Sequence, residues 1–394
     1  MTHMNILYIN GWSINDQLTV ATSFPSLNIL SNSSAVESIT FITPEVTKST
    51  RTLKLKNTIH IGLPVNNSIS GSLVRFFEEL FFLCALIQIC NKKKFDLIIA
   101  RGAPSGGRAS FLSFFLKIPF VVESFEPHSR YMIDSGVWSC FDPRFWVQRF
   151  WEHSVIKRAS AIVAVSNNFS NKLIRDGVEA ARVFTTPCTV DLVKFAFNLN
   201  NRICVRAELS IPLDAIVGIY VGKFGGIYFD LDDSFKIFSE AFRVFKKFYL
   251  VILSDVSKEE INNIISDNGY NIDPKSVIIQ SVAHTQVSSY LSSADFGYAL
   301  IKNGPSKLYC SPVKIGEYWA SGLPVIIPDG IGDDSAIVAN SKLGVIVSDK
   351  EGWTYSERLH LILSNKTHRT AIFDLARKYR SSELIVKTYK ALGF

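Results

Sequence analysis

The chain of 394 residues is poor in the residues that mark several protein classes. It has 22 glycines and 14 prolines without a low-complexity tract, which excludes a collagen-like chain and flexible linkers. Its six cysteines form no C-x-x-C pair, so we expect reduced thiols rather than a disulfide framework. No set of histidines, cysteines and carboxylates has the spacing of metal ligands, and we expect neither a metal nor a cofactor.

Segments typical of secretion or membrane insertion are also missing. Residues 1–10 have no basic leader, and their apolar run is short. No apolar stretch reaches the about 18 residues without charges that a membrane span requires. The nearest stretch, 73–90, contains Arg75, Glu78 and Glu79. We therefore expect a cytoplasmic protein.

Apolar side chains and positive charge are abundant instead. Hydrophobic residues make up 47% of the chain and charged residues 20%, which excludes a disordered chain. The net charge of +7 lies almost entirely in residues 1–190, which hold 19 basic and 13 acidic residues. This excess favours an anionic partner such as a phosphate-bearing substrate, a membrane surface or nucleic acid, although solubility alone explains it equally well.

One apolar stretch fits two placements. Residues 73–90 have the length of a helix, and three lysines, 92–94, follow them. Such a helix either lies on the inner face of a membrane, in peripheral contact, or packs against a sheet with the lysines at its C-terminus.

Short apolar runs separated by helix-length segments fill both halves of the chain. This pattern is typical of parallel strands covered on both faces, as in doubly wound α/β domains. We expect two Rossmann-like domains, 1–190 and 191–375, whose ligands bind at the carboxyl ends of the strands. The expected strands are 5–9, 38–43, 96–100, 120–123, 161–166, 217–222, 249–253, 276–280, 296–300, 324–328 and 344–347.

The segment 311–325 predicts a helix with an anion site. Ser311 is a good N-cap, Pro312 suits the first helical position, and Gly322 is expected at the C-cap. Free N–H groups and partial positive charge at a helix N-terminus attract anions.

Two charged residues of this helix fit a nucleoside diphosphate. Lys314 adds a cation to the first turn, where the helix is already positive, which is reasonable if an anion binds there. Glu317 lies on the same face and is suited to accept hydrogen bonds from sugar hydroxyls. An ordinary solvent-facing Lys–Glu pair is the alternative.

The run K-I-G-E-Y-W-A-S-G-L-P-V-I, 314–326, resembles the donor-binding helix of glycosyltransferase family 4. Its S-P-x-K-x-x-E-Y form is similar to a subgroup common in bacterial polysaccharide synthesis. The first strand and segments 165–173, 221–223 and 292–297 match in order. The resemblance implies a GT-B fold, in which two Rossmann-like domains face each other across a cleft, and a metal-independent, retaining transfer. It also implies that a C-terminal helix within 376–394 returns to the first domain.

The resemblance assigns donor-binding roles around this helix. Glu317 matches the glutamate that usually holds the donor ribose. The family's other glutamate, seven residues before it, is replaced by Tyr309, a departure at the position that normally touches the donor sugar. Cys310 and Ser311 are expected to offer backbone N–H groups to the phosphates or the sugar.

A glycine-rich loop after an expected strand is the second donor segment. Gly222 and Gly225 allow close approach of a pyrophosphate, and Lys223 adds charge. Lys223 matches the family's basic residue here, whereas residues 227–228 lack the family's second lysine. We expect Lys314 to take its place, although a glycine after a strand is more often only a turn.

Candidate residues of the first domain also follow expected strands. His128, with Glu126 beside it, matches a loop histidine that contacts the donor sugar or supports the transition state in the family. Gly11, Arg101 and Arg108 are expected in cleft loops that face an acceptor, the arginines suiting a phosphorylated one. The alternatives are that His128 forms only a structural hydrogen bond and that the glycine-containing loops are ordinary turns.

The run Asp230-Leu231-Asp232-Asp233 resembles the D-x-D metal motif of another transferase class. Because a helical pattern follows directly, we interpret Asp232 or Asp233 as a helix N-cap instead.

These observations predict a retaining, hexosyltransferase-type glycosyltransferase. A nucleoside-diphosphate sugar would be the donor, and a glycan or lipid-linked hydroxyl in cell-surface polysaccharide synthesis the acceptor. His128, Glu126, Lys223 and Lys314 are the expected catalytic residues, the lysines stabilising the departing diphosphate. A nucleotide-sugar epimerase or hydrolase of the same fold and a non-catalytic, two-lobed sugar-binding protein are the alternatives. Nucleic acid is not an expected partner.

Overall fold

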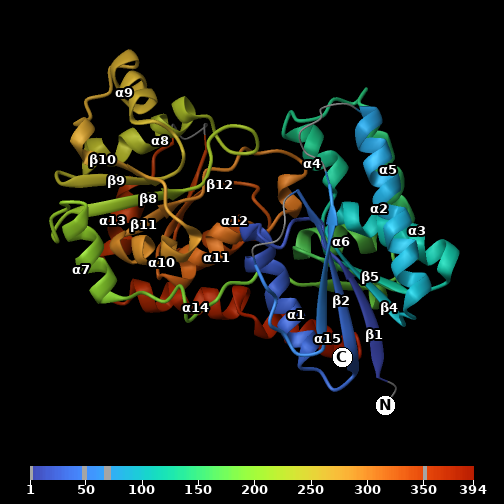
Figure 1. The fold of residues 1–394 in the computed structure, drawn as a ribbon. Helices are drawn as coiled ribbons and strands as arrows, with labels where there is room; N and C mark the ends of the chain where they lie inside the picture. Colours follow the sequence, from blue (N-terminus) through green and yellow to red (C-terminus); the bar gives the residue numbers. More distant parts are fainter. Residues whose placement is uncertain (1–2, 47–50, 66–71, 349–352) are drawn as a thin grey trace. The chain divides into compact units, whose positions relative to one another are not determined.

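A computed structural model describes residues 3–46, 51–65, 72–348 and 353–394. The chain folds into two units, each built around a parallel sheet (Figure 1). The first, unit 1, comprises Met1–Ile133, Trp138–Thr189 and Ser382–Phe394, and unit 2 comprises Asp134–Val137 and Val190–Ser381. No helix within the described ranges is long and apolar enough to cross a membrane.

The described residues of unit 1 form seven parallel strands in the order β3-β2-β1-β4-β5-β6-β7. The chain runs outward from β1 to β3, then crosses back to β4 beside β1. Residues of β1, β4 and β6 are buried because helices cover both faces of the sheet. The strands are β1 (Met4–Ile9), β2 (Val36–Glu45), β3 (Thr58–Pro64), β4 (Leu97–Arg101), β5 (Phe120–Phe125), β6 (Ala161–Ala164) and β7 (Val183–Thr185).

Both ends of the chain contribute to one face of this sheet. Leu27 of α1 and Tyr389 of α15 join Tyr8 of β1 and Val121 of β5 in one buried cluster. The last helix, α15, therefore belongs to unit 1. The helices of unit 1 are α1 (Phe24–Ser31), α2 (Ser72–Lys92), α3 (Ala103–Leu116), α4 (His128–Asp134, which ends in unit 2), α5 (Pro143–Arg158), α6 (Asn167–Arg175) and α15 (Glu383–Ala391).

The predicted strands of this half are confirmed, but two further strands were missed. Both missed strands, β3 and β7, lie at the edges of the sheet. Ile59 of β3 is 60% exposed, and β7 has three residues of intermediate burial. Edge strands are not covered on both sides, so they lack the continuous apolar run that identifies the inner strands.

Within the part of unit 2 that the structure describes, six parallel strands lie in the order β10-β9-β8-β11-β12-β13, and all six were predicted. Two large clusters of buried side chains cover its two faces. The strands are β8 (Ile216–Val221), β9 (Phe248–Leu253), β10 (Val277–Gln280), β11 (Phe296–Tyr298), β12 (Val325–Pro328) and β13 (Val345–Val347). The helices are α7 (Leu199–Glu208), α8 (Leu231–Val244), α9 (Lys258–Asp267), α10 (His284–Ser293), α11 (Val313–Ala320), α12 (Asp334–Ser341), α13 (Ser356–Ser364) and α14 (His368–Arg380).

One expected helix start in unit 2 differs from the structure. Helix α8 begins at Leu231, after Asp230, and no side chain caps it. Asp230 instead binds Lys302 and Asp233 binds Lys236, so the predicted capping role of Asp232 or Asp233 is wrong. The helix expected within 376–394 corresponds to α15, which lies in unit 1.

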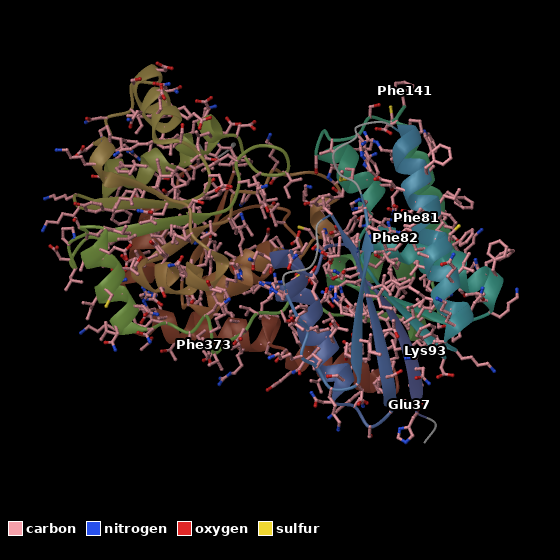
Figure 2. All side chains as sticks on the ribbon, viewed as in Figure 1. Glu37, Phe81, Phe82, Lys93, Phe141 and Phe373 are labelled. Carbon is pink, nitrogen blue, oxygen red and sulfur yellow. The ribbon has the colours of Figure 1, made fainter. Side chains whose placement is uncertain are left out.

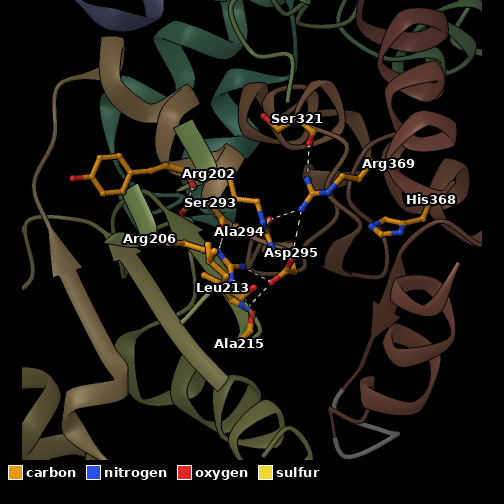
Figure 3. A network of polar contacts seen from close by, with 12 residues as sticks. Arg202, Arg206, Leu213, Ala215, Ser293, Ala294, Asp295, Ser321, His368 and Arg369 are labelled. Atoms are coloured by element: carbon orange, nitrogen blue, oxygen red, sulfur yellow. Dashed lines mark hydrogen bonds and ion pairs between the residues drawn. The ribbon is translucent and has the colours of Figure 1, made fainter. Parts of the chain in front are cut away.

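A buried ion cluster holds the helices of unit 2 on its sheet (Figure 3). Asp295, just before β11, accepts hydrogen bonds of 2.8 Å from Arg202 and Arg206 of α7 and from the backbone N–H of Val217 in β8. Arg369 of α14 approaches the same carboxylate to 3.6 Å. Burial lowers the pKa of Arg369 to about 10. Asp295 therefore joins two helices and two strands at one point.

Replacing Asp295 by alanine should lower the free energy of unfolding by about 3–5 kcal/mol, because the fully buried Arg206 then loses its counter-charge. Urea denaturation of the two proteins measures the difference. Asp374→Ala removes an exposed pair with Arg377 on α14 and is the matched control, expected to change stability little. A small effect of Asp295→Ala would show that the cluster does not hold the fold.

Candidate functional site

The candidate site of unit 2 lies at the carboxyl edge of its sheet. Strands β8 and β11 are neighbours, but the chain continues from β8 to β9 on one side and from β11 to β12 on the other. Such a switch point is where open α/β sheets bind ligands. The loops that leave this edge carry Gly222, the start of α10 and the start of α11.

Helix α11 begins one residue later than expected. Pro312 is the N-cap, and no side chain caps the helix. The Ser311 hydroxyl instead accepts a hydrogen bond from Arg380 of α14, so its predicted capping role is wrong. The predicted stop is confirmed, because the helix ends at Ala320 and Gly322 follows with φ of +68°.

Arg380 holds the loop in front of α11. It also forms a buried ion pair with Asp334 of α12, and its guanidinium lies 5.8 Å from the Trp319 ring. In the same loop the Cys310 thiol donates to the carbonyl of Lys307. Tyr309 lies half-buried in the short 3-10 turn before it. These contacts fix the backbone that leads into the helix.

Lys314 is the most unusual residue of the site. Its Nζ is buried without a hydrogen-bond partner, although the rest of the residue is partly exposed. The nitrogen lies 4.1 Å from the centre of the Tyr228 ring and 5.1 Å from that of Tyr220. Burial lowers the pKa of Lys314 to about 7, and nearby Glu317 opposes this shift. The Lys314 amine is thus a buried basic group to which the described residues offer no hydrogen-bond acceptor.

The structure brings Gly222 and Lys314 together. A Cβ at Gly222 would stand 2.8 Å from Lys314 Nζ, and the φ of Gly222 is +133°. Only glycine fits there. Gly225, with φ of +76°, turns the same loop. Lys223 is exposed, and its carbonyl accepts a hydrogen bond of 2.5 Å from the Tyr220 hydroxyl.

Glu317 has a partner that the sequence analysis missed. The carboxylate is 5% exposed, and its Oε1 lies 2.9 Å from Nε2 of His284, the first residue of α10. On the far side of the ring, Lys194 Nζ lies 3.5 Å from Nδ1. A lysine can only donate, so this arrangement favours a proton on Nε2, which donates to Glu317. A histidine after an expected strand was the only available signal.

Arg101 and Arg108 of unit 1 do not lie in an open loop, although the sequence predicted one. The segment after Arg101 is helix α3, and its glycines serve packing. A Cβ at Gly107 would stand 2.9 Å from the Trp151 side chain of α5. Arg101 is buried and pairs with Glu123 at 2.7 Å, whereas Arg108 pairs with Glu79 of α2.

His128 begins α4, close to the carboxyl end of β5. Burial lowers its pKa to about 4, so the ring is neutral at physiological pH. Its ring centre lies 5.8 Å from that of Trp138, edge to face. Glu126 precedes it in the loop. Gly11 follows β1, and a Cβ at Gly11 would stand 3.4 Å from Ser105 Oγ and 3.7 Å from the Arg101 carbonyl oxygen.

Solved structures share this fold at low identity. Sucrose-phosphate synthase from Thermosynechococcus elongatus is 16% identical over 99% of this chain and 98% of its own, with a TM-score of 0.72. HepE from Anabaena, solved with UDP and glucose, is 13% identical over 99% and 100%, with a TM-score of 0.69. A UDP-N-acetylglucosamine 2-epimerase is 11% identical over 100% and 96%, with a TM-score of 0.63.

The family comparison covers part of unit 1. Residues 57–189 match a family described as "Glycosyl transferase 4-like domain". No curated protein sequence matches the chain. The chain thus has the two-domain Rossmann-like GT-B fold, and residues 57–189 of it are similar to a glycosyl transferase 4-like domain. Similarity at these low identities shows the fold, and the reaction has to be inferred from the residues of the site.

Lys314→Met should stabilise the protein near neutral pH. The pKa of Lys314 is lower in the folded state, so unfolding takes up a proton between pH 7 and the ordinary lysine range. The stability gained by the variant is therefore largest at or below pH 7 and shrinks by up to about 1.4 kcal/mol per pH unit above it. Urea denaturation of both proteins from pH 6.5 to 9 measures this change. A difference that stays constant over this range would contradict the burial of a titrating ammonium.

Proposed function

We propose that the protein is a retaining glycosyltransferase that moves a sugar from a nucleoside-diphosphate sugar to a hydroxyl of a glycan or lipid-linked acceptor. We further infer that it acts in bacterial cell-surface polysaccharide synthesis, without a metal. The observation that carries the proposal is the unpaired ammonium of Lys314 beside Gly222 and Glu317 at the switch point of unit 2. The glycosyl transferase 4-like domain and the UDP and glucose bound to HepE support it.

Unit 2 would bind the donor. Gly222 leaves room for a diphosphate, and Lys314 supplies the positive charge that now lacks a partner. An anion beside this nitrogen would raise its pKa again, so donor binding and protonation of Lys314 support each other. Glu317, oriented by His284, would accept hydrogen bonds from ribose hydroxyls.

The transfer step is driven by stabilising the leaving diphosphate. The bond between the sugar C1 and the phosphate oxygen breaks as the acceptor oxygen bonds to C1 from the same face. The acceptor proton passes to the leaving phosphate oxygen, so no enzymic nucleophile is consumed. Lys314 and Lys223 offset the charge that develops there. In unit 1, the neutral ring of His128, with Glu126 beside it, is the proposed hydrogen-bonding group for the reacting sugar.

An epimerase that acts on a nucleotide sugar is a second candidate, because the chain shares its fold with UDP-N-acetylglucosamine 2-epimerase. The glycosyl transferase 4-like domain over residues 57–189 favours transfer. Incubation with a nucleotide sugar separates the two reactions. A transferase releases nucleoside diphosphate when an acceptor is present, whereas an epimerase changes the sugar without releasing nucleotide.

Calorimetric titration with UDP, GDP, CDP and dTDP tests the donor site. We expect selective binding of one nucleotide and a loss of about 10- to 150-fold in affinity in Glu317→Ala, the range for losing a hydrogen bond to a charged group. Glu259→Ala, an exposed glutamate of α9, is the control and should bind as the wild type does. No binding of any nucleotide by the folded protein would contradict the proposal.

His284→Ala should lower the affinity for the same nucleotide by a smaller factor of about 2–12. The variant loses the hydrogen bond that orients Glu317 but keeps the contact between Glu317 and the nucleotide. His284→Gln retains an N–H donor and should recover most of the affinity. The same calorimetric titration measures both variants. Equal affinity of the alanine and glutamine variants would show that the His284 hydrogen bond does not position Glu317.

A further inference from the structure

Three helices of unit 1 expose apolar side chains on their outward faces. In α2, Phe77, Leu80 and Phe81 are 62%, 48% and 56% exposed, and Cys84 is exposed beyond them. Their spacing places them on one stripe of the helix. The opposite stripe, with Phe82 and Leu86, is buried in unit 1. Helix α2 is therefore apolar both toward the sheet and toward solvent.

Helices α3 and α5 continue this surface. Phe114 and Phe115 of α3 are 54% and 60% exposed, and Trp146 and Phe150 of α5 are 57% and 64% exposed. Phe141, just before α5, is 89% exposed. We name this surface the α2–α3–α5 face. Its apolar members are Phe77, Leu80, Phe81, Phe114, Phe115, Phe141, Trp146, Val147 and Phe150.

Direct contacts join the three helices into one layer. Arg108 of α3 pairs with Glu79 of α2 at 2.7 Å, and its guanidinium lies 4.0 Å from the Phe82 ring. Phe111 of α3 contacts Trp151 of α5, with ring centres 6.3 Å apart. Figure 2 labels Phe81 and Phe141 along this side of unit 1. Large contiguous apolar patches on a soluble unit mark interaction sites.

The charges among these side chains are positive. The exposed charged residues of α5 are Arg144, Arg149, Lys157 and Arg158, and its one glutamate is buried. Arg149 lies 6.0 Å from the Trp146 ring centre, and Lys117, after α3, lies 5.3 Å from that of Phe114. The acidic residues of α2 are half-buried, and Glu79 is paired. Arg144 is paired with Asp142 at 2.5 Å, and the other exposed charges of α5 are all positive and alternate with its aromatic side chains.

We propose that the α2–α3–α5 face binds the surface of a bilayer that contains anionic lipids. Aromatic rings enter the boundary between headgroups and acyl chains, and the arginines and lysines meet lipid phosphates. A second copy of this chain fits less well, because a symmetric contact would place the same positive charges against each other. The link to a lipid-linked acceptor rests on the proposed function, whereas binding to vesicles does not.

Flotation of the full chain with vesicles tests the proposal. We expect binding to phosphatidylcholine vesicles that contain phosphatidylglycerol, weaker binding to phosphatidylcholine alone, and release by salt. The triple variant Phe81→Ser, Phe115→Ser, Phe150→Ser should bind about tenfold or more weakly, because each ring contributes buried apolar area. The matched control, Val193→Ser with Leu361→Ser, removes exposed apolar residues of unit 2 and should bind as the wild type does.

A second variant separates the contribution of positive charge to vesicle binding from that of apolar area. Arg149→Ser with Lys157→Ser should lose the preference for phosphatidylglycerol and retain the weak binding to phosphatidylcholine. Equal binding of the wild type and the triple variant, or no binding by folded wild type, would overturn the proposal. A wild-type dimer in sedimentation that the triple variant dissociates would also overturn it, by making a second copy the occupant.

Measuring nucleotide affinity distinguishes a failure of this proposal from a failure of the proposed function. The triple variant should bind nucleotide as the wild type does, which shows that it is folded. If the wild type binds vesicles but no nucleotide, the proposal for the α2–α3–α5 face is supported and the proposed donor site is contradicted.

Discussion

The carboxylate of Asp295 is the interaction on which the packing of unit 2 depends. Parallel strands are buried on both faces, so polar groups at their ends must be paired within the protein. Asp295 satisfies the N–H of Val217 and two guanidinium groups of α7, and it attracts Arg369 of α14. Removing it would leave buried positive charge beside the strands that carry the site. Asp295 precedes β11 and Val217 lies at the start of β8, so this paired charge fixes the amino ends of the two strands whose carboxyl ends lead to Gly222 and α11.

Against this background of paired charges, the isolation of Lys314 is informative. Arg206 and Arg380 each have a carboxylate partner, yet the Lys314 nitrogen faces two tyrosine rings and a glycine instead. Its pKa falls to about 7 because burial disfavours the charged form. A buried amine of this kind is unfavourable for stability, and such groups are concentrated at functional sites. Glu317 differs from Lys314 in having a partner, because its Oε1 lies 2.9 Å from Nε2 of His284.

Local patterns predicted the inner strands and the stop of α11, because continuous apolar runs and a glycine with positive φ are fixed by neighbours in sequence. Contacts between residues far apart in the sequence could not be predicted from local patterns. Ser311 does not cap α11, since Arg380, 69 residues away, takes its hydroxyl. His284 meets Glu317 across 33 residues. The sequence also could not tell the inner stripe of α2 from the outer one, because both are apolar.

The two ends of the chain meet in one core, since Tyr389 of α15 packs with Tyr8 of β1 and its hydroxyl donates to Glu123. Residues 190–381 of unit 2 stand between β7 and α15 in the chain. During synthesis the strands of unit 1 are therefore all present before α15, and the part of their core that Tyr389 fills stays uncovered until unit 2 has been made.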